Sequence, residues 1–244
     1  MLITGGSRGI GAATALMAAT RGHDVAISYR SDTEAAAAVV AACEAAGAHA
    51  QAFECDAGDP AQVEALFHAT INAFGSIRTF VNNAGILHPV ARVDEIEVER
   101  LREVVAVNVI GAFIGAREAV RHMSTRHGGN GGSIVNVSSA ASYLGSPNEF
   151  VDYASTKGAL DTLTIGLAKE VADEGVRVNA VRPGLIHTDI HRSAGRPDRV
   201  ETLAPNVPMQ RGGSADEVAE VIWWLASDAS SYVTGTLVNC SGGR

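Results

Sequence analysis

Four polar residues in the middle of the chain are spaced in a way that favours carbonyl and alcohol chemistry. Tyr153 and Lys157 are four residues apart, so on a helix their Cβ atoms would lie about 5–6 Å apart on one face. Ser139 and Asn108 supply further polar groups upstream. A tyrosine that exchanges a proton near pH 7 indicates reduction of a ketone or oxidation of a secondary alcohol. A Tyr-x-x-x-Lys pair alone is equally typical of an exposed helix surface.

An ammonium group beside Tyr153 is expected to lower the pKa of that phenol. A free tyrosine has a pKa near 10, which is too high for efficient proton exchange at pH 7. Lowering the pKa by about three units requires roughly 4 kcal/mol. One unit charge about 4 Å away, at an effective dielectric of about 20, supplies about that much. Lys157 is therefore sufficient in magnitude.

A glycine-rich segment near the beginning of the chain fits a dinucleotide. Thr4, Gly5, Gly9 and Gly11 form a TGxxxGxG arrangement between a strand pattern and an Ala-rich helix pattern. Glycines at such a place allow a tight turn, and they let backbone N–H groups at the helix N-terminus approach a pyrophosphate. A tight turn without a ligand is the alternative.

The residue after the second strand pattern bears on the choice of nucleotide. Arg30 lies 21 residues after Gly9, where an acidic residue would bind a ribose hydroxyl and an arginine accommodates a 2′-phosphate. Arg8 adds a second positive charge, and forked donors suit a phosphate. We therefore predict that NADP(H) is preferred. Asp32 leaves NAD(H) as an alternative, and Arg30 could also be a solvated loop residue.

Polar residues also follow the third and fourth strand patterns. Asp56 ends the third, where its carboxylate could accept the adenine amino group or cap a turn. Asn82, Asn83, Ala84 and Gly85 end the fourth, in the crevice where parallel sheets bind ligands.

Strand and helix patterns alternate along the whole chain, which predicts an α/β fold. We expect a Rossmann-like, doubly wound sheet of about seven parallel strands with helices on both faces, in a single domain over residues 1–244. The first strand is unusually short, and a helix begins at Asp59-Pro60 and another at the Ser214-x-x-Glu217 capping box. Residues 192–211 break the alternation and are predicted to form a substrate lid. The expected strands are Leu2–Thr4, Val25–Tyr29, Ala48–Cys55, Thr79–Asn82, Ile134–Val137, Val176–Val181 and Thr236–Val238.

Composition narrows the class of protein further. The chain has 244 residues and a formal net charge of −8, which argues against a nucleic-acid partner. No apolar run approaches the ~20 residues of a membrane span, and no signal peptide is visible. Three cysteines without metal-type spacing suit a reducing compartment, so we expect a cytoplasmic protein with no membrane partner.

Taken in order, these motifs resemble the short-chain dehydrogenase/reductase family over the stretch from Thr4 to the C-terminus. The resemblance is carried by TGGSRGIG at Thr4–Gly11, CD at Cys55-Asp56, NNAG at Asn82–Gly85, the asparagine of VNVIG at Asn108, the IVNVSS segment ending at Ser139, YASTK at Tyr153–Lys157, PGLIHT at Pro183–Thr188 and SYVTG at Ser231–Gly235.

The resemblance implies roles for individual residues. Tyr153 would be the general acid and base, Ser139 would bind the substrate oxygen, and Asn108 would hold a water that links Lys157 to solvent. Ser138 competes with Ser139, because Ser139 lies one residue further from Tyr153 than is usual, and we expect the extra residue to bulge within Ser142–Glu149. The cofactor-binding residues would be Gly5, Ser7, Arg8, Gly9, Ile10, Gly11, Arg30, Asp56, Ala57, Asn83, Ala84, Gly85, Tyr153, Lys157, Pro183, Gly184, Ile186 and Thr188.

The expected activity is an NADP(H)-dependent oxidoreductase that acts on a ketone or secondary alcohol. A non-catalytic NADP(H)-binding sensor or scaffold, an NAD(H)-dependent alcohol or sugar dehydrogenase and an isomerase or dehydratase of the same fold stay open. The substrate would be a small molecule, set by Ser142–Asp152 and Ile190–Gln210. Arginines at 192, 196 and 199 suggest an anionic group on it, and a solvated basic loop is the alternative. No metal site is expected, since His187 and His191 lack a third ligand. The resemblance also implies a homotetramer, through helices at about Glu97–Arg121 and Tyr153–Val171.

Overall fold

The computed structural model describes residues 1–244 and contains one seven-stranded sheet in which all neighbouring strands are parallel. The strand order is β3-β2-β1-β4-β5-β6-β7. This confirms the predicted fold class. The strands are β1 Leu2–Ile3, β2 Val25–Tyr29, β3 Ala50–Glu54, β4 Thr79–Asn82, β5 Gly132–Val137, β6 Val176–Pro183 and β7 Leu237–Cys240.

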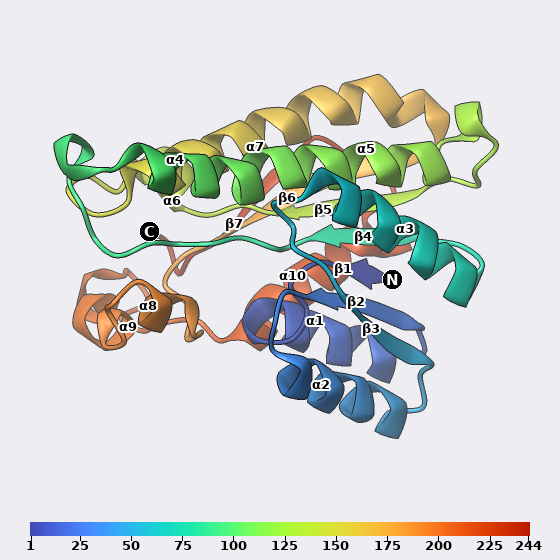
Figure 1. Cartoon of the computed structure of the whole chain (residues 1–244), viewed down its shortest axis with the longest axis horizontal. Helices are drawn as coiled ribbons and strands as arrows, with labels where there is room; N and C mark the ends of the chain where they lie inside the picture. The colour runs from blue at the N-terminus through green and yellow to red at the C-terminus, as the bar shows by residue number, and fades with distance from the viewer.

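Helices cover both faces of the sheet, with α1, α2 and α10 on one side and α3, α5 and α7 on the other (Figure 1). The ten α-helices are α1 Gly9–Thr20, α2 Thr33–Ala45, α3 Pro60–Phe74, α4 Val98–Val105, α5 Ala112–Met123, α6 Ala141–Leu144, α7 Val151–Val171, α8 Ile190–Ser193, α9 Arg199–Leu203 and α10 Ala215–Ala226.

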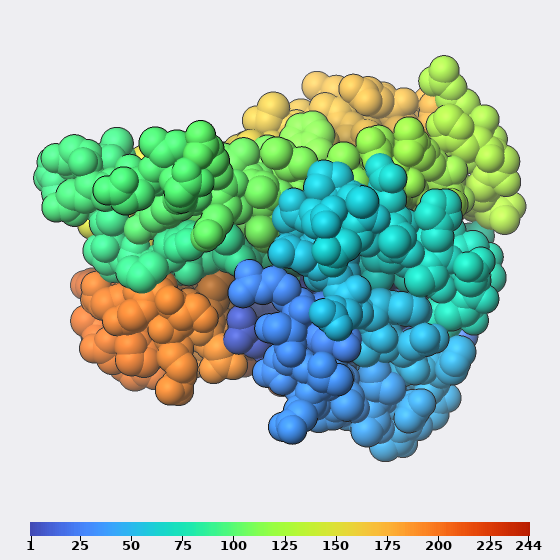
Figure 2. Space-filling model, viewed as in Figure 1, coloured from blue at the N-terminus to red at the C-terminus, as the bar shows by residue number.

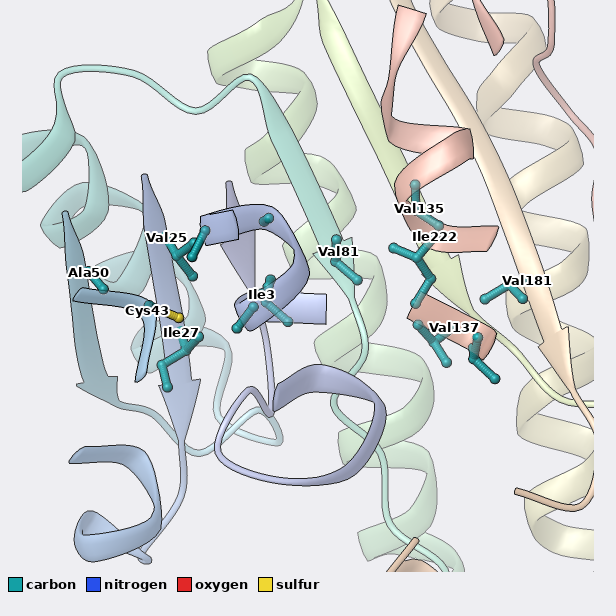
Figure 3. Packing of buried hydrophobic residues seen from close by; sticks show 14 of the residues in the cluster. Ile3, Val25, Ile27, Cys43, Ala50, Val81, Val135, Val137, Val181 and Ile222 are labelled. Carbon is teal, nitrogen blue, oxygen red and sulfur yellow. The ribbon is translucent and has the colours of Figure 1, made fainter. Parts of the chain in front are cut away.

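Successive strand residues alternate between two apolar layers, as the pleat of a sheet requires. Ile3 and Val81 face the layer that contains α1 and α10, whereas their neighbours Leu2 and Phe80 face α3, α5 and α7. Figure 3 shows the first layer, in which Ile222 of α10 lies over the central strands. Because both faces of the sheet are covered, the central strands β1 and β4 contribute fully buried side chains such as Ile3 and Val81.

The direction of strand addition reverses between β1 and β4. The chain runs from β1 outward to β2 and β3, and then returns to place β4 on the other side of β1. The loops after β1 and β4 therefore diverge at one edge of the sheet and open a crevice there, which is where sheets of this kind bind ligands.

Two predicted helix starts are confirmed. The Asp59 carboxylate accepts hydrogen bonds from the N–H groups of Ala61 and Gln62 at the start of α3. Ser214 and Glu217 form a reciprocal capping box at the start of α10. Both caps satisfy N–H groups that a helix end leaves without partners.

The structure corrects several predicted boundaries. β3 is shorter than predicted, because it ends where its pairing with β2 ends, and β6 is longer because it pairs with β5 and then with β7. The helix expected over Glu97–Arg121 is divided into α4 and α5 by a π-helical turn at Ala106–Gly111. The expected loop at 192–211 contains α9 and follows α8.

None of the helices combines the length and the continuous apolar character needed to cross a lipid bilayer.

Candidate active site

The glycine turn after β1 forms one wall of the crevice. Gly5 and Gly9 have positive φ angles of 64° and 55°, which other residues rarely adopt. A Cβ atom on Gly11 would lie 2.4 Å from the carbonyl oxygen of Gly5, so the turn needs a glycine there. No side chain caps α1, and the first N–H groups of this helix are left available to an anion.

Asn83, after β4, fastens this turn from the opposite side. Its Nδ2 group donates to the carbonyl oxygens of Thr4 (2.8 Å) and Gly5 (3.0 Å). Its backbone N–H donates to Oγ1 of Thr4 at 3.0 Å. The side chain predicted to contact the cofactor is thus committed to the glycine turn, while Ala84 and Gly85 line the cavity.

The two arginines predicted to select the nucleotide line the same cavity. Arg8 lies in the glycine turn and Arg30 follows β2, and neither forms an ion pair with a carboxylate. Asp32, the residue that left NAD(H) open, caps α2 by accepting a hydrogen bond from the Ala35 N–H at 3.0 Å. Asp32 is therefore hydrogen-bonded within its own helix, whereas neither arginine has a carboxylate partner.

Asp56 and Ala57 follow β3 and lie beside these arginines in the cavity wall. One carboxylate oxygen of Asp56 accepts a hydrogen bond from the Gly58 N–H at 2.8 Å. The turn-capping alternative for Asp56 is therefore realised, and its second carboxylate oxygen has no hydrogen-bond donor in the protein.

The predicted reactive pair lies on α7. The Lys157 ammonium group is 5.5 Å from the centroid of the Tyr153 ring and donates a hydrogen bond to the carbonyl oxygen of Val137 at 2.8 Å. The structure distinguishes the two serines after β5. Ser139 interacts with the Tyr153 hydroxyl, whereas the buried Ser138 hydroxyl donates to the backbone oxygen of Lys157. Ser139 is therefore the serine placed at the reacting position.

The expected pKa shift of Tyr153 has the opposite sign in the structure. Burial raises the pKa of Tyr153 to about 12, and the hydrogen bond with Ser139 opposes that change only in part. Burial also lowers the pKa of Lys157 to about 8, against an opposing contribution from Asp161. The argument from the sequence considered charge alone, and desolvation of both groups outweighs it. At pH 7 Tyr153 is a neutral phenol.

The segment between Ser139 and Tyr153 contains the irregular backbone that the extra residue predicts. Helix α6 ends at Gly145, and Ser146 and Asn148 both have positive φ angles (44° and 60°) before α7 begins. Such angles are uncommon for residues with a side chain, and they mark a locally strained turn.

Asn108 lies within the π-helical turn, and its side chain is fully engaged. Its Oδ1 atom accepts the Ile86 N–H at 2.8 Å, and its Nδ2 group donates to the Ile86 carbonyl (3.0 Å) and to Thr156 (3.2 Å). The asparagine thus connects the loop after β4 to α7, next to Lys157. Single π-helical turns are frequent at functional sites. Its predicted part in holding a water stays a prediction.

The segment after β6 closes the crevice. Pro183 is the last residue of the strand and Gly184 follows it. The Ala140 N–H donates to the Pro183 carbonyl at 2.9 Å, and Ile186 pairs with Gly213. Ile186 and Thr188 line the cavity, and Thr188 lies close to Gly9 of the first turn. The first and the last of the predicted cofactor-binding motifs, the glycine turn and PGLIHT, therefore lie next to each other at the cavity.

One cavity of about 370 Å³ gathers nearly all the predicted site residues. Only Gly11 and Asn108 are not part of its lining, because Gly11 packs against the glycine turn and Asn108 lies behind Ile86. The ranges predicted to set the substrate contribute Leu144, Phe150 and Ile190. Leu87 and Arg244 also line the cavity and were not among the predicted residues. Leu87 could have been found in the sequence from its position two residues after the NNAG motif.

The lid segment is anchored through an ion pair. Both guanidinium nitrogens of the buried Arg199 donate to the two carboxylate oxygens of Glu149, at 2.8 and 2.6 Å, and the Arg196 guanidinium lies 3.8 Å from the same carboxylate. Figure 2 shows this orange segment directly below the green segment around residues 90–105. Two of the three arginines that suggested an anionic substrate are thus paired with a protein carboxylate. These two arginines therefore do not indicate an anionic group on the substrate.

The histidines of the lid do not form a metal centre. His191 Nε2 lies 3.1 Å from the Ile186 carbonyl oxygen, and His187 lies 3.7 Å from Glu201. No group of three or more His, Cys, Asp or Glu side chains in the protein is arranged to hold a metal ion.

The known proteins that this chain resembles agree with this fold and site. A family model described as "Enoyl-(Acyl carrier protein) reductase" matches residues 5–244. The fold, the glycine turn and the Ser, Tyr and Lys side chains around one cavity define an oxidoreductase with a nicotinamide cofactor. The chain belongs to the short-chain dehydrogenase/reductase family.

Relatives cover essentially the whole chain. An uncharacterized oxidoreductase of Escherichia coli, YgfF, is 51% identical and aligns over 100% of this chain and 98% of its own length. The 3beta-hydroxysteroid dehydrogenase 1 of Eggerthella lenta is 39% identical over 100% of this chain and 92% of its own. Among solved structures, a short-chain dehydrogenase from Burkholderia cenocepacia in complex with NADP has a TM-score of 0.91 at 33% identity and covers 99% and 96% of the two chains.

Proposed function

We propose that the protein is an NADP(H)-dependent oxidoreductase that interconverts a ketone and a secondary alcohol, with Tyr153 as the proton donor and acceptor. The observation that carries the proposal is the meeting of Ser139, Tyr153 and Lys157 in the cavity that also contains the glycine turn. A nicotinamide bound there would supply or accept the hydride. The protein would position the substrate and deliver the proton, and solvent would return a proton to Tyr153 after each turnover.

Each of the three side chains has a distinct task in this proposal. For carbonyl reduction, Tyr153 gives its proton to the substrate oxygen, and its raised pKa keeps it protonated at neutral pH. Ser139 donates a hydrogen bond to the same oxygen as negative charge develops on it. The Lys157 ammonium group stabilises the phenolate that Tyr153 becomes and binds the ribose hydroxyls of the cofactor.

The preference for NADP(H) is supported by Arg8 and Arg30. Both line the cavity without an acidic partner, and Asp32 is occupied in capping α2. A structure of a 3-ketoacyl-(acyl-carrier-protein) reductase from Brucella melitensis, 31% identical with a TM-score of 0.91, holds NADH, so related proteins use both nucleotides. Replacing Arg30 with alanine should raise KM for NADPH about tenfold or more and leave KM for NADH within about twofold.

The single domain 1–244 would use residues 192–211 as a lid over a small carbonyl compound. The lid is anchored by Arg199 to Glu149, and the cavity beneath it is lined by apolar side chains such as Leu144 and Phe150. These side chains favour a substrate that is apolar where it contacts them. A panel of cyclic ketones, diketones, steroids and 3-oxoacyl thioesters, followed by NADPH absorbance, tests the class.

The Tyr153→Phe variant tests the mechanism itself. Loss of a general acid typically reduces kcat by about 10²- to 10⁴-fold. NADPH binding, measured by fluorescence titration, should weaken far less than turnover does, because most of the residues predicted to bind the cofactor lie elsewhere in the cavity. Full turnover in this variant would show that Tyr153 is not the proton donor. Binding of NADPH without turnover of any carbonyl by the wild type would favour a sensor instead.

A homotetramer is the assembly that the exposed surface supports. Large apolar side chains lie exposed on α4, the π-helical turn, α5 and α7, all on one side of the sheet in Figure 1. Exposed apolar patches of this kind are typical of interfaces. Light scattering coupled to size exclusion measures the mass, and Phe113→Glu should reduce it if this face is the interface. The exposed apolar residues of this face are Val98, Leu101, Val105, Ile110, Phe113 and Ile165.

A further inference from the structure

Lys157 lies in surroundings that oppose its positive charge. Its side chain is buried, and its ammonium group has one hydrogen-bond acceptor in the protein, the Val137 carbonyl oxygen. No carboxylate contacts it. A buried ammonium group without a neighbouring negative charge tends to lose its proton. The reaction proposed above nevertheless needs the charged form.

A carboxylate lies one helical turn behind this lysine. Asp161 is four residues after Lys157 on α7, and side chains of a helix lean toward its N-terminus, so Asp161 extends over the turn that carries the lysine. The Asp161 side chain is only 8% exposed. Its charge favours the protonated lysine and opposes the effect of burial.

The hydrogen bonds of Asp161 are unevenly distributed. Arg182 donates to Oδ2 twice, from Nε at 3.0 Å and from Nη2 at 2.7 Å. The other oxygen, Oδ1, is buried and has no partner. The arginine therefore uses only one oxygen of this carboxylate, although arginine frequently pairs with both. The other oxygen, with its share of the negative charge, has no hydrogen bond and belongs to the residue one helical turn after Lys157.

The partner, Arg182, belongs to the other half of the site. It immediately precedes Pro183 on β6, and its guanidinium also lies 5.3 Å from the centroid of the Tyr143 ring of α6. The pair thus joins the lysine helix to the segment predicted to hold the nicotinamide.

Other ionisable groups around this turn bring no free carboxylate to Lys157. On α7 itself these groups are Tyr153 and Asp152, and Asp152 is bound by Arg100 of α4. From β6 the group is Arg182, and from α6 it is Tyr143.

We propose that Asp161 is a positioning residue for the reaction: held by Arg182, it keeps a negative charge one turn behind Lys157 and so maintains the ammonium form that the reaction requires. The inference rests on the proposed function only for the use of that ammonium group. The effect of Asp161 on the charge of Lys157 can be measured without any enzyme turnover.

The chain offers an unusually clear measurement, because Lys157 and Lys169 are its only lysines. NMR of protein labelled with ¹³C-lysine gives one titration curve for each, and the exposed Lys169 serves as an internal reference. Asp161→Asn should lower the midpoint of Lys157 by about one pH unit or more, the size expected when one unit charge is removed from the next helical turn at an effective dielectric of about 20 to 40. Lys169 should not move.

Three further variants separate charge from structure. Asp161→Glu keeps the charge and should restore most of the midpoint. Arg182→Gln breaks the same ion pair but keeps the carboxyl group, so the midpoint of Lys157 should stay above that in Asp161→Asn. Glu118→Gln removes another buried carboxylate that pairs with arginines, on α5, and should also leave Lys157 unchanged.

A midpoint of Lys157 that is unchanged in Asp161→Asn overturns the proposal. So does a midpoint in Asp161→Glu that is as low as in Asp161→Asn, because that result shows that a negative charge at this position has no effect on Lys157. If Asp161→Asn does not fold, the double variant Asp161→Asn with Arg182→Gln leaves no buried unpaired charge, and its midpoint should still lie below that of the wild type.

Activity provides a second readout. With an active wild type, the basic limb of kcat/KM for carbonyl reduction should move to lower pH in Asp161→Asn, in step with the NMR midpoint. A wild type without turnover would refute the proposed function, while the NMR titration would still decide the role of Asp161.

Discussion

The ion pair between Arg100 and Asp152 is expected to be the strongest single polar support of the reactive helix. Arg100 of α4 donates to both carboxylate oxygens of Asp152, at 2.7 and 3.1 Å, and to the Pro89 carbonyl at 2.6 Å. Asp152 is the residue before Tyr153, and its side chain is only 2% exposed. The arginine thus fastens the first turn of α7 and the loop after β4 to α4.

The Arg100→Gln variant would leave the Asp152 carboxylate buried without its cation. Breaking a buried pair from one side costs about 3–5 kcal/mol. Backbone N–H groups of α7 still donate to this carboxylate, so we expect a value near the lower end, about 3 kcal/mol. For a domain of about 150–250 residues, 1 kcal/mol lowers Tm by about 2–4 °C, which predicts a fall of about 6–12 °C.

The pH dependence of this loss has a definite sign. Burial tends to raise the pKa of Asp152, but the hydrogen bonds from Arg100 and from the backbone outweigh it and lower the pKa below the usual value. A carboxylate with a lowered pKa stabilises the fold above its unfolded pKa of about 3.9, and this contribution is lost as the pH falls through the folded value. The Tm gap between wild type and variant should therefore persist at pH 5–8 and narrow below about pH 4.

Thermal unfolding followed by circular dichroism measures these values. Arg92→Gln is the matched control, since Arg92 and Asp94 form an ion pair whose side chains are 61% and 72% exposed. Removing an exposed pair changes stability by about 0–1 kcal/mol. A fall in Tm for Arg100→Gln no larger than that of Arg92→Gln would refute the reasoning, and so would a gap that is independent of pH down to about pH 3.

Three further predictions concern the site itself. Gly11→Ala should weaken NADPH binding, measured by fluorescence titration, by about tenfold or more, because the added Cβ would lie 2.4 Å from the Gly5 carbonyl oxygen. Ser139→Ala should lower kcat by about 10²-fold, as loss of an oxyanion donor does, whereas Ser138→Ala should lower it less than about tenfold. The rate of carbonyl reduction should fall above pH 8, since burial lowers the pKa of Lys157 to about 8 and its ammonium form disappears there; a rate that is flat from pH 7 to 10 would contradict this.

Much of the fold was predictable because its signals are local. The Asp59 and Ser214 caps, the glycine turn and the alternation of strands with helices each depend on residues close together in sequence. The same holds for Tyr153 and Lys157, whose relative position follows from four residues of helix. The NNAG and PGLIHT motifs could be placed at one edge because parallel strands end on the same side of a sheet.

The features that could not be predicted depend on partners far apart in sequence. Glu149 and Arg199 are 50 residues apart, and their pairing engages Arg199 with a protein carboxylate instead of a substrate. The π-helical turn at Asn108 arises within a pattern that reads as one continuous helix. A single sequence gives residue types and spacing, and it does not give the distance between segments that meet only in the fold.

The pKa values of Tyr153 and Lys157 also depend partly on local spacing, which the sequence gives, and partly on burial, which only the fold gives. The spacing of Tyr153 and Lys157 correctly indicated an interacting pair, but the sign of the tyrosine pKa shift depends on how much water each group retains. In the structure both groups are desolvated, so the phenol is a weaker acid and the lysine a stronger acid than in water. Desolvation thus acts against the ammonium group that proton transfer needs. Asp161, one helical turn behind the lysine and held by Arg182, is the residue that we propose supplies the opposing negative charge.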